Sequence, residues 1–170
     1  TGDGYLQGYN AQAAVDESLL IVAATVSNIA SDTPQLMPVL KQIQSIVGES
    51  PTMLLADAGY ASEANFTALE DANQAACIAL GREGKDAART IDSTTHPATA
   101  RMHARMASDE GKAHYRRRKT LPEPVFGWLK SIVGITGFFG RGLLSVQAEW
   151  PLICAAMNLR RMHKMGLQTA

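Results

Sequence analysis

Hydrophobic and polar positions change their period along the first half of the chain, and each period predicts a different element. Apolar side chains at every second position predict a strand, short apolar runs predict buried strands, and apolar side chains three or four positions apart predict helices. Asp32 and Ser62 are expected to cap helices, and Gly48 to end one. The predicted elements are, in order, strands over 5–15 and 19–26, a helix over 34–47, a strand over 53–56, a helix over 63–73 and a strand over 75–80.

The second half of the chain has a different pattern. Few large apolar side chains occur over 82–108, which predicts a polar insertion. Helical patterns follow, and Pro151 is expected to interrupt or kink the last of them. The sequence predicts an α/β fold, a mixed sheet flanked by helices, with three parts: 1–81, 82–108 and 109–170. The helices predicted after the insertion begin at 109, cover 121–133, and cover 143–165 behind a glycine-rich turn over 134–142.

Composition supports a folded domain and excludes several classes of protein. The chain has 170 residues, of which 46% are hydrophobic and 19% charged, as in globular proteins. No apolar run approaches the roughly 18 residues that a membrane helix needs, so no membrane partner is expected. Cys77 and Cys154 lie far apart in apolar stretches, which excludes a disulfide framework and a thiolate zinc site. The cytoplasm is therefore the expected compartment.

Charge divides the chain although the net charge is zero. Residues 1–81 carry one basic residue against nine acidic ones, and residues 82–170 carry fifteen basic residues against seven acidic ones. A basic half suits a polyanion such as nucleic acid. It equally suits simple neutralisation of the acidic half on folding, and the charges alone leave both interpretations open.

Asp57 is the first candidate for chemistry, because it follows the predicted strand over 53–56 directly and precedes Gly59. A carboxylate at the end of a rigid strand is well placed to hold a metal ion or to act as a general base. An aspartate two residues before a glycine is also typical of a turn that the side chain caps. Local sequence favours the turn interpretation.

Glu123 and Lys130 form the second candidate site. Seven residues are nearly two helical turns, so the two side chains are expected on one helix face, where they would suit a metal ion and a phosphate. The alternative is a capping box from Thr120 to Glu123. The basic run over 116–119 could likewise be a solvated helix face.

Glu149 is a rival acid within the last predicted helix. It lies among apolar residues, and a buried acid needs a partner. We expect a structural ion pair with Arg141, Arg160 or Arg161 rather than a metal ligand.

Taken in order, several motifs resemble the DDE transposase domain of bacterial insertion sequences. The resemblance covers nearly the whole chain except 82–108, and the box around Glu123 is its most specific part. The motifs are Gly8-Tyr9-Asn10-Ala11-Gln12-Ala13-Ala14-Val15-Asp16, then Ala56-Asp57-Ala58-Gly59-Tyr60, then Tyr115, Arg118 and Glu123-Pro124-Val125-Phe126-Gly127 with Lys130, and finally Arg141-Gly142, Glu149 and Asn158-Leu159.

This resemblance implies an RNase H-like fold in which three carboxylates hold two Mg²⁺ (or Mn²⁺) ions. Asp57 matches the second acid and Glu123 the third. Tyr115 and Lys130 match the DNA-binding signature. Its arginine position matches either Arg118, which is one residue too far from Glu123, or Lys119, which has the usual spacing. The implied partner is double-stranded DNA, as element terminal inverted repeats and target DNA, and a homodimer is allowed. The residues expected on DNA are Tyr115, Arg116, Arg117, Arg118, Lys119 and Lys130.

The first strand of that fold and its aspartate have no counterpart. Asp16 lies in the predicted hairpin turn and Asp32 at a helix start, and neither is where the first acid belongs. Because the chain also begins at Thr1, we expect the C-terminal portion of a transposase catalytic domain, inactive by itself. Two other functions stay open at this point: an RNase H-like nuclease, and a non-catalytic DNA-binding remnant of a decayed element.

Overall fold

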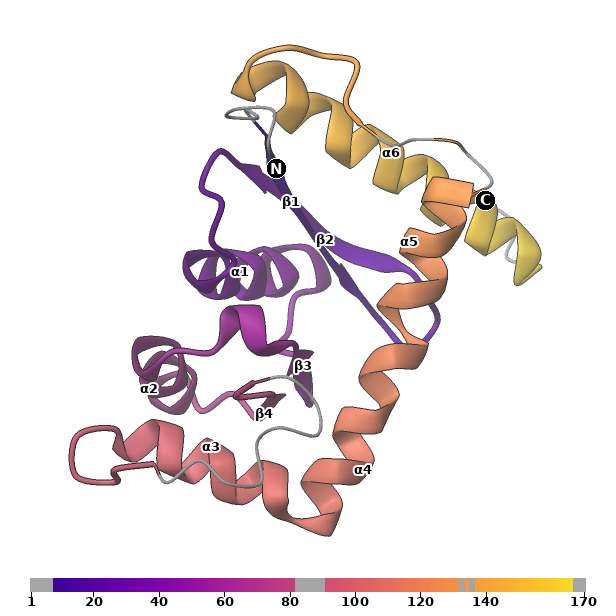
Figure 1. Ribbon diagram of the computed structural model, residues 1–170. Helices are drawn as coiled ribbons and strands as arrows, with labels where there is room; N and C mark the ends of the chain where they lie inside the picture. The colour runs from indigo at the N-terminus through magenta and orange to yellow at the C-terminus, as the bar shows by residue number, and fades with distance from the viewer. Residues whose placement is uncertain (1–7, 82–90, 132–133, 135–136, 167–170) are drawn as a thin grey trace.

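The computed structural model describes residues 8–81, 91–131, 134 and 137–166. Strands and helices alternate through the first half, and the second half of the described chain is helical, which confirms the predicted α/β class (Figure 1). The strands are β1 (Asn10–Val15), β2 (Ile21–Ser27), β3 (Leu54–Ala56) and β4 (Ala76–Ile78). The α-helices are α1 (Leu36–Val47), α2 (Glu63–Asp71), α3 (Pro97–Ala107), α4 (Asp109–Arg117), α5 (Pro122–Ser131) and α6 (Leu143–Lys164), with short 3-10 helices η1 (Thr33–Gln35), η2 (Ala58–Tyr60) and η4 (Arg118–Thr120).

The described strands form two separate two-stranded sheets. β1 pairs with β2 in an antiparallel hairpin, and β3 pairs with β4 in parallel. Within the described part of the chain, no strand pairs with the other edge of β1 or with the other edge of β3. The single mixed sheet that the sequence predicted is therefore present as two halves.

Each half-sheet has its own hydrophobic core. Phe66 and Leu69 of α2 are 1% exposed and pack with α1 and α3 around β3 and β4. Trp150 of α6 is 3% exposed, and its indole N–H donates to the Gln12 carbonyl of β1 at 2.8 Å. In Figure 1 the β1–β2 hairpin crosses the molecule with α6 on one side and α1 on the other. Helix α1 connects the two halves, because its Leu36 and Leu40 belong to the first core and its Gln42 Oε1 accepts the Ala24 N–H of β2 at 2.8 Å.

Most predicted elements occur close to their expected positions. α1 covers 36–47 and ends at Gly48 in the left-handed conformation, with φ 87°, as the sequence predicted. Ser62 caps α2 by accepting a hydrogen bond from the Asn65 N–H. The first predicted strand begins later than expected, at Asn10, and its residues 5–7 lie outside the described part, as do 132–133 of the helix predicted over 121–133.

The polar insertion predicted over 82–108 is a helix in its second part. α3 covers 97–107 and buries Ala98 and Met102, while 82–90 lie outside the described residues. One alanine and two methionines, Met102 and Met106, carry this packing, so the segment has few of the large apolar side chains by which sequence patterns reveal a helix.

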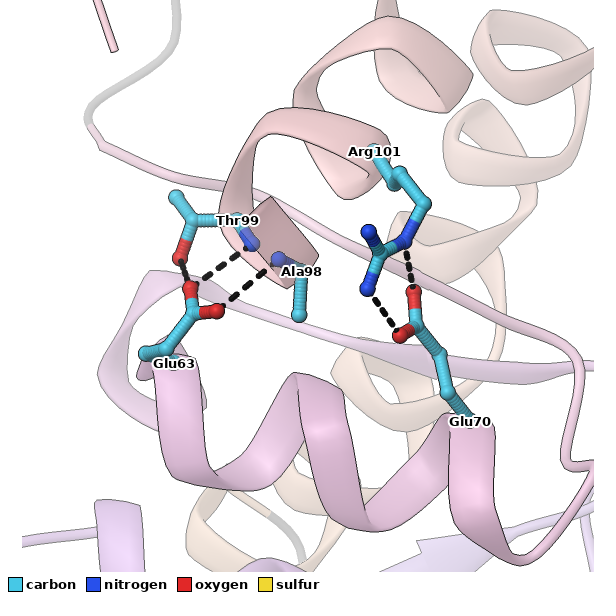
Figure 2. Close-up of polar contacts among 5 residues, drawn as sticks. All are labelled: Glu63, Glu70, Ala98, Thr99 and Arg101. Atoms are coloured by element: carbon cyan, nitrogen blue, oxygen red, sulfur yellow. Dashed lines mark hydrogen bonds and ion pairs between the residues drawn. The ribbon is translucent and has the colours of Figure 1, made fainter. Parts of the chain in front are cut away.

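Two carboxylates of α2 attach α3 to the rest of the domain (Figure 2). Glu63 accepts the N–H groups of Ala98 and Thr99 at 2.8 and 2.9 Å, and the Thr99 hydroxyl at 2.6 Å. An anion at a helix N-terminus satisfies N–H groups that have no partner within the helix. Glu70 forms a two-point contact with the Arg101 guanidinium, one turn further along α3.

This attachment predicts a pH-dependent stability. The hydrogen bonds to Glu63, led by that from the Thr99 hydroxyl, lower the pKa of its carboxyl. A lowered folded-state pKa contributes stability that is complete above the ordinary glutamate range and is lost as pH falls through the folded value. We expect Glu63→Gln to flatten the acid limb of the unfolding free energy against pH, measured by denaturant titration. Glu49→Gln, at an exposed position, is the control, and an unchanged acid limb in Glu63→Gln would contradict the prediction.

Pro151 does not interrupt the last helix. α6 is continuous from Leu143 to Lys164 with Pro151 inside it. The ring lies on the exposed side, while Val146, Trp150 and Cys154 are buried on the other. Burial on both sides of the proline keeps the two halves of α6 in one helix, although the missing N–H removes one helical hydrogen bond.

Candidate functional site

A cavity lies between the unpaired edges of β1 and β3 and brings the two halves of the domain to one place. Consecutive residues of both strands line it, so backbone as well as side chains face the space. Its lining residues are Ala11–Ala14 of β1, Leu36 and Val39 of α1, Leu54–Ala56 of β3, then Asp57, Tyr60, Arg118, Pro122, Glu123 and Phe126.

Asp57 follows β3 directly and lines this cavity, as the strand-end prediction requires. One carboxylate oxygen, Oδ1, accepts the Gly59 N–H at 2.9 Å, so the turn-capping interpretation is also confirmed. The side chain is 51% exposed. Asp57 therefore fixes its own turn with one oxygen and presents the other to the cavity.

Glu123 lies in the first turn of α5 and lines the same cavity as Asp57. The capping box predicted from Thr120 to Glu123 is not formed: the helix begins at Pro122, and the Thr120 hydroxyl donates to the Arg117 carbonyl at 2.8 Å. The exposed Glu123 side chain is therefore not engaged in capping its helix.

Arg118 lies at the candidate site. Its guanidinium Nη1 is 3.9 Å from Asp57 Oδ2, and its Cζ atom lies 5.4 Å from the centre of the Tyr115 ring. Its Nε is buried and makes no hydrogen bond to a described residue. Arg118 thus places a positive charge beside Asp57, in the cavity that Glu123 also lines. The side chain of Lys119, the other candidate for the arginine position, lies outside the described residues.

The remaining basic candidates lie away from this cavity. Arg116 and Lys130 are exposed, and neither lines it. Arg117 pairs with Glu17 through one contact of 2.7 Å between Nη2 and Oε1, so one member of the basic run does pair with an acid of the first half. Glu123 and Lys130 lie in the first and last turns of the same helix, α5, and a role for Lys130 on a phosphate stays a prediction.

The sequence did not predict a hydrogen-bonded cluster near Asp57, which is formed by Asn10, Gln12, Asp32 and Tyr60. The side chains of Asn10 and Gln12 both donate to Asp32 Oδ1 at 2.8 Å, and the Tyr60 hydroxyl donates to Gln12 Oε1. Burial, followed by the negative charges of Asp32 and Asp57, raises the pKa of Tyr60, which keeps its hydroxyl protonated as a donor. The available signal was two amides at alternate positions of one strand, which point to the same sheet face.

Glu149 is not in the ion pair that the sequence predicted. Its two carboxylate oxygens accept the N–H groups of Phe139 and Gly140 at 2.9 and 2.8 Å. Arg160 lies over the Trp128 ring, and Arg161 donates to the Ser18 carbonyl. Backbone N–H groups satisfy the acid instead of arginine, because Phe139 and Gly140 lie against α6.

The donors at the cavity suit a hard divalent cation. Carboxylate oxygens are the ligands that Mg²⁺ and Mn²⁺ prefer in proteins. Asp57 and Glu123 supply two such groups to one cavity, and the described residues contain no cluster of three or more histidine, cysteine or acidic side chains that could hold a metal ion. The residues fit such an ion as part of its ligand set.

Comparison with known proteins gives one match. A family model described as "Transposase DDE domain" matches residues 1–159. No curated protein and no solved structure matches the chain. None of the described helices is both long enough and apolar enough to cross a membrane.

Proposed function

Because this chain belongs to the transposase DDE-domain family, we propose that it is the C-terminal part of an insertion-sequence transposase that cuts and joins DNA with Mg²⁺ or Mn²⁺. One observation carries the proposal: Asp57 and Glu123, which match the second and third acids of that family, line one cavity although they are 66 positions apart in the sequence. Two carboxylates that line one cavity suit metal binding better than separate turn and helix caps.

The first acid of the set would come from a strand between β1 and β3. Both facing edges are unpaired within the described chain, and a cavity follows each strand along consecutive residues. A strand placed there would join the two half-sheets into one mixed sheet of the RNase H-like kind and would end beside Asp57. Neither Asp16, which holds the hairpin turn through the N–H groups of Ser18 and Leu20, nor Asp32 lies on a strand.

The chain's own residues would divide the work by charge. Asp57 and Glu123 would hold the metal ions, which stabilise the attacking and leaving oxygens of an in-line phosphoryl displacement. Arg118 would keep the carboxylates from repelling one another before the metal arrives, since its guanidinium is beside Asp57. Arg116 and Lys130, both exposed, would contact backbone phosphates, which positions DNA without reading its sequence.

A cut-and-join assay tests the proposal. Protein containing the whole catalytic domain is incubated with terminal-repeat DNA, target DNA and Mn²⁺. Joined products that require Asp57 and Glu123 support a transposase. Cleavage without joining would instead identify a nuclease, and DNA binding without cleavage would identify a non-catalytic module.

The basic run predicts a difference between neighbouring arginines. Arg116→Ala should weaken binding about equally on all DNA sequences and reduce the slope of log affinity against log salt by about 1, because one phosphate contact and its released counterions are lost. Arg117→Ala should lower stability as well, since Arg117 already pairs with Glu17. Fluorescence anisotropy over a salt series and thermal unfolding measure the two effects.

Glu17→Gln provides the matched control for Arg117. It breaks the same ion pair, which joins exposed groups and is worth at most about 1 kcal/mol, but it leaves the arginine available to DNA. An unchanged salt slope in Arg116→Ala, measured on folded protein, would remove Arg116 from the DNA surface.

A further inference from the structure

We infer that Asp32 is a positioning residue that fixes the turn carrying Asp57, and that Asn10 and Gln12 of β1 fix Asp32 in turn. The inference rests on the proposed role of Asp57 as a metal ligand. It concerns side chains that the three-carboxylate scheme leaves without a role, and it explains how an exposed ligand can be held rigidly.

Asp32 is held from the β1 side by two amide groups. Asn10 Nδ2 and Gln12 Nε2 each donate to its Oδ1 at 2.8 Å, and Gln12 Nε2 also donates to Asn10 Oδ1 at 2.5 Å. Gln12 is only 6% exposed, so its amide depends on these partners. Asp32 was expected to cap a helix, but it makes no side-chain capping bond. Its carboxylate is used for a contact between elements instead.

The other side of Asp32 meets the Asp57 turn at Gly59. A Cβ atom at Gly59 would lie 2.8 Å from Asp32 Oδ2 and 3.0 Å from Asp57 Oδ1, so the glycine separates the two carboxylates with no room for a side chain. Thr33, next to Asp32, donates its hydroxyl to the Gly59 carbonyl at 3.1 Å. The turn therefore contacts Thr33 through the Gly59 carbonyl and faces Asp32 at the Gly59 Cα.

Tyr60 and Asn65 complete the support of the turn. The Tyr60 hydroxyl donates to Gln12 Oε1, which connects the turn back to β1. Asn65 Nδ2 donates to the Thr33 and Tyr60 carbonyls at 2.7 and 2.8 Å. The turn after β3 is thus connected to β1, to the start of η1 and to α2.

The two carboxylates beside Gly59 are in different states. Asp32 has one oxygen occupied by two amide donors and the other against Gly59, which suits support rather than metal binding. Asp57 has Oδ2 in a loose 3.9 Å contact with Arg118 and is half exposed. Ligands held by such surrounding groups bind metal more tightly, and loss of one supporting group typically costs about 10–100-fold in affinity or activity.

Mn²⁺ binding to the DNA-free 170-residue chain tests the inference without any need for activity. Paramagnetic broadening of the amide signals of residues 57–60 is followed during a Mn²⁺ titration. We expect Asp57→Asn to abolish this local broadening and Asp32→Ala to raise the half-saturating Mn²⁺ concentration at least about 10-fold. Asp32→Asn keeps an acceptor for both amides and should stay within about threefold of the unsubstituted chain.

A second pair of variants keeps the test valid even if the Asp32 variants do not fold. Gly59→Ala inserts a methyl group between the two carboxylates and should weaken Mn²⁺ binding in the same way as Asp32→Ala. Gly127→Ala on α5 is its control and should leave Mn²⁺ binding unchanged, because a Cβ atom added at Gly127 would meet no other atom within 4 Å.

The outcomes separate this inference from the proposed function. If Asp32→Asn abolished the Mn²⁺ broadening as completely as Asp57→Asn, Asp32 would be a metal ligand and the positioning role would be overturned. Unchanged Mn²⁺ binding in folded Asp32→Ala and Gly59→Ala would overturn the inference alone, whatever their unfolding temperatures. Mn²⁺ binding that does not depend on Asp57 would overturn the proposed function, and the positioning role with it.

Discussion

Glu123→Gln, in protein containing the whole catalytic domain, is expected to abolish strand cleavage and transfer while leaving DNA affinity nearly unchanged. Gln keeps the shape of the side chain but loses the charge that a hard cation requires. Since loss of a group that merely supports a ligand costs about 10–100-fold, loss of the ligand itself should exceed that. The result would not reflect loss of a capping box, because the Thr120 hydroxyl donates to the Arg117 carbonyl and forms no capping box with Glu123.

Glu149→Gln is the matched control, on an acid with a structural role. Its two oxygens accept the N–H groups of Phe139 and Gly140, and Gln offers one acceptor oxygen in place of two. We expect a loss of about 1.5–3 kcal/mol in unfolding free energy, the scale of a hydrogen bond to a charged group, with chemistry retained in the folded fraction. Full strand transfer by Glu123→Gln, or a well-folded Glu149→Gln with no chemistry, would reverse the assignment of the third acid.

The second large effect concerns the cavity between β1 and β3. The 170-residue chain by itself is expected to join no terminal-repeat DNA, because its described residues bring only two acids, Asp57 and Glu123, to the cavity. A longer chain that adds a strand bearing an aspartate should join DNA in the presence of Mg²⁺. Strand joining by the 170-residue chain, dependent on Mg²⁺, would show that the two carboxylates suffice.

Hydrogen exchange gives a structural measure of the same insertion. The Leu54 N–H donates to the carbonyl of Ala75, the residue just before β4, at 2.9 Å. Alternation along a strand directs the next N–H, that of Leu55, to the opposite edge. We expect slow exchange at Leu54 in both chains, and slowing at Leu55 only in the longer one. Equal exchange at Leu55 in both chains would place the added strand elsewhere.

The sequence predicted most accurately the elements that are decided by residues close together in the chain. Apolar spacing predicts α1, and Gly48 in the left-handed conformation ends it. The Ser62 cap of α2 likewise depends only on residues within one helical turn. The position of Asp57 at a strand end follows equally from an apolar run that stops. These features were predicted because the groups that decide them are neighbours in the chain.

The ordered motifs also predicted the family, and the family model confirms it over residues 1–159. The three-carboxylate scheme, with Asp57 and Glu123 as two of its members, remains a prediction that the structure supports by placing both acids on one cavity.

Only the tertiary structure decided what each charged or polar side chain contacts. Glu149 accepts backbone N–H groups instead of arginine, Arg118 lies beside an aspartate 61 positions away, and Asp32 supports the Asp57 turn instead of capping a helix. A charge has no fixed partner until folding brings distant segments together, and several partners of similar energy are available to it in the sequence. Apolar periodicity and capping depend on near neighbours and are therefore readable in advance, whereas the partners of Asp32, Arg118 and Glu149 depend on how two half-sheets and their helices pack.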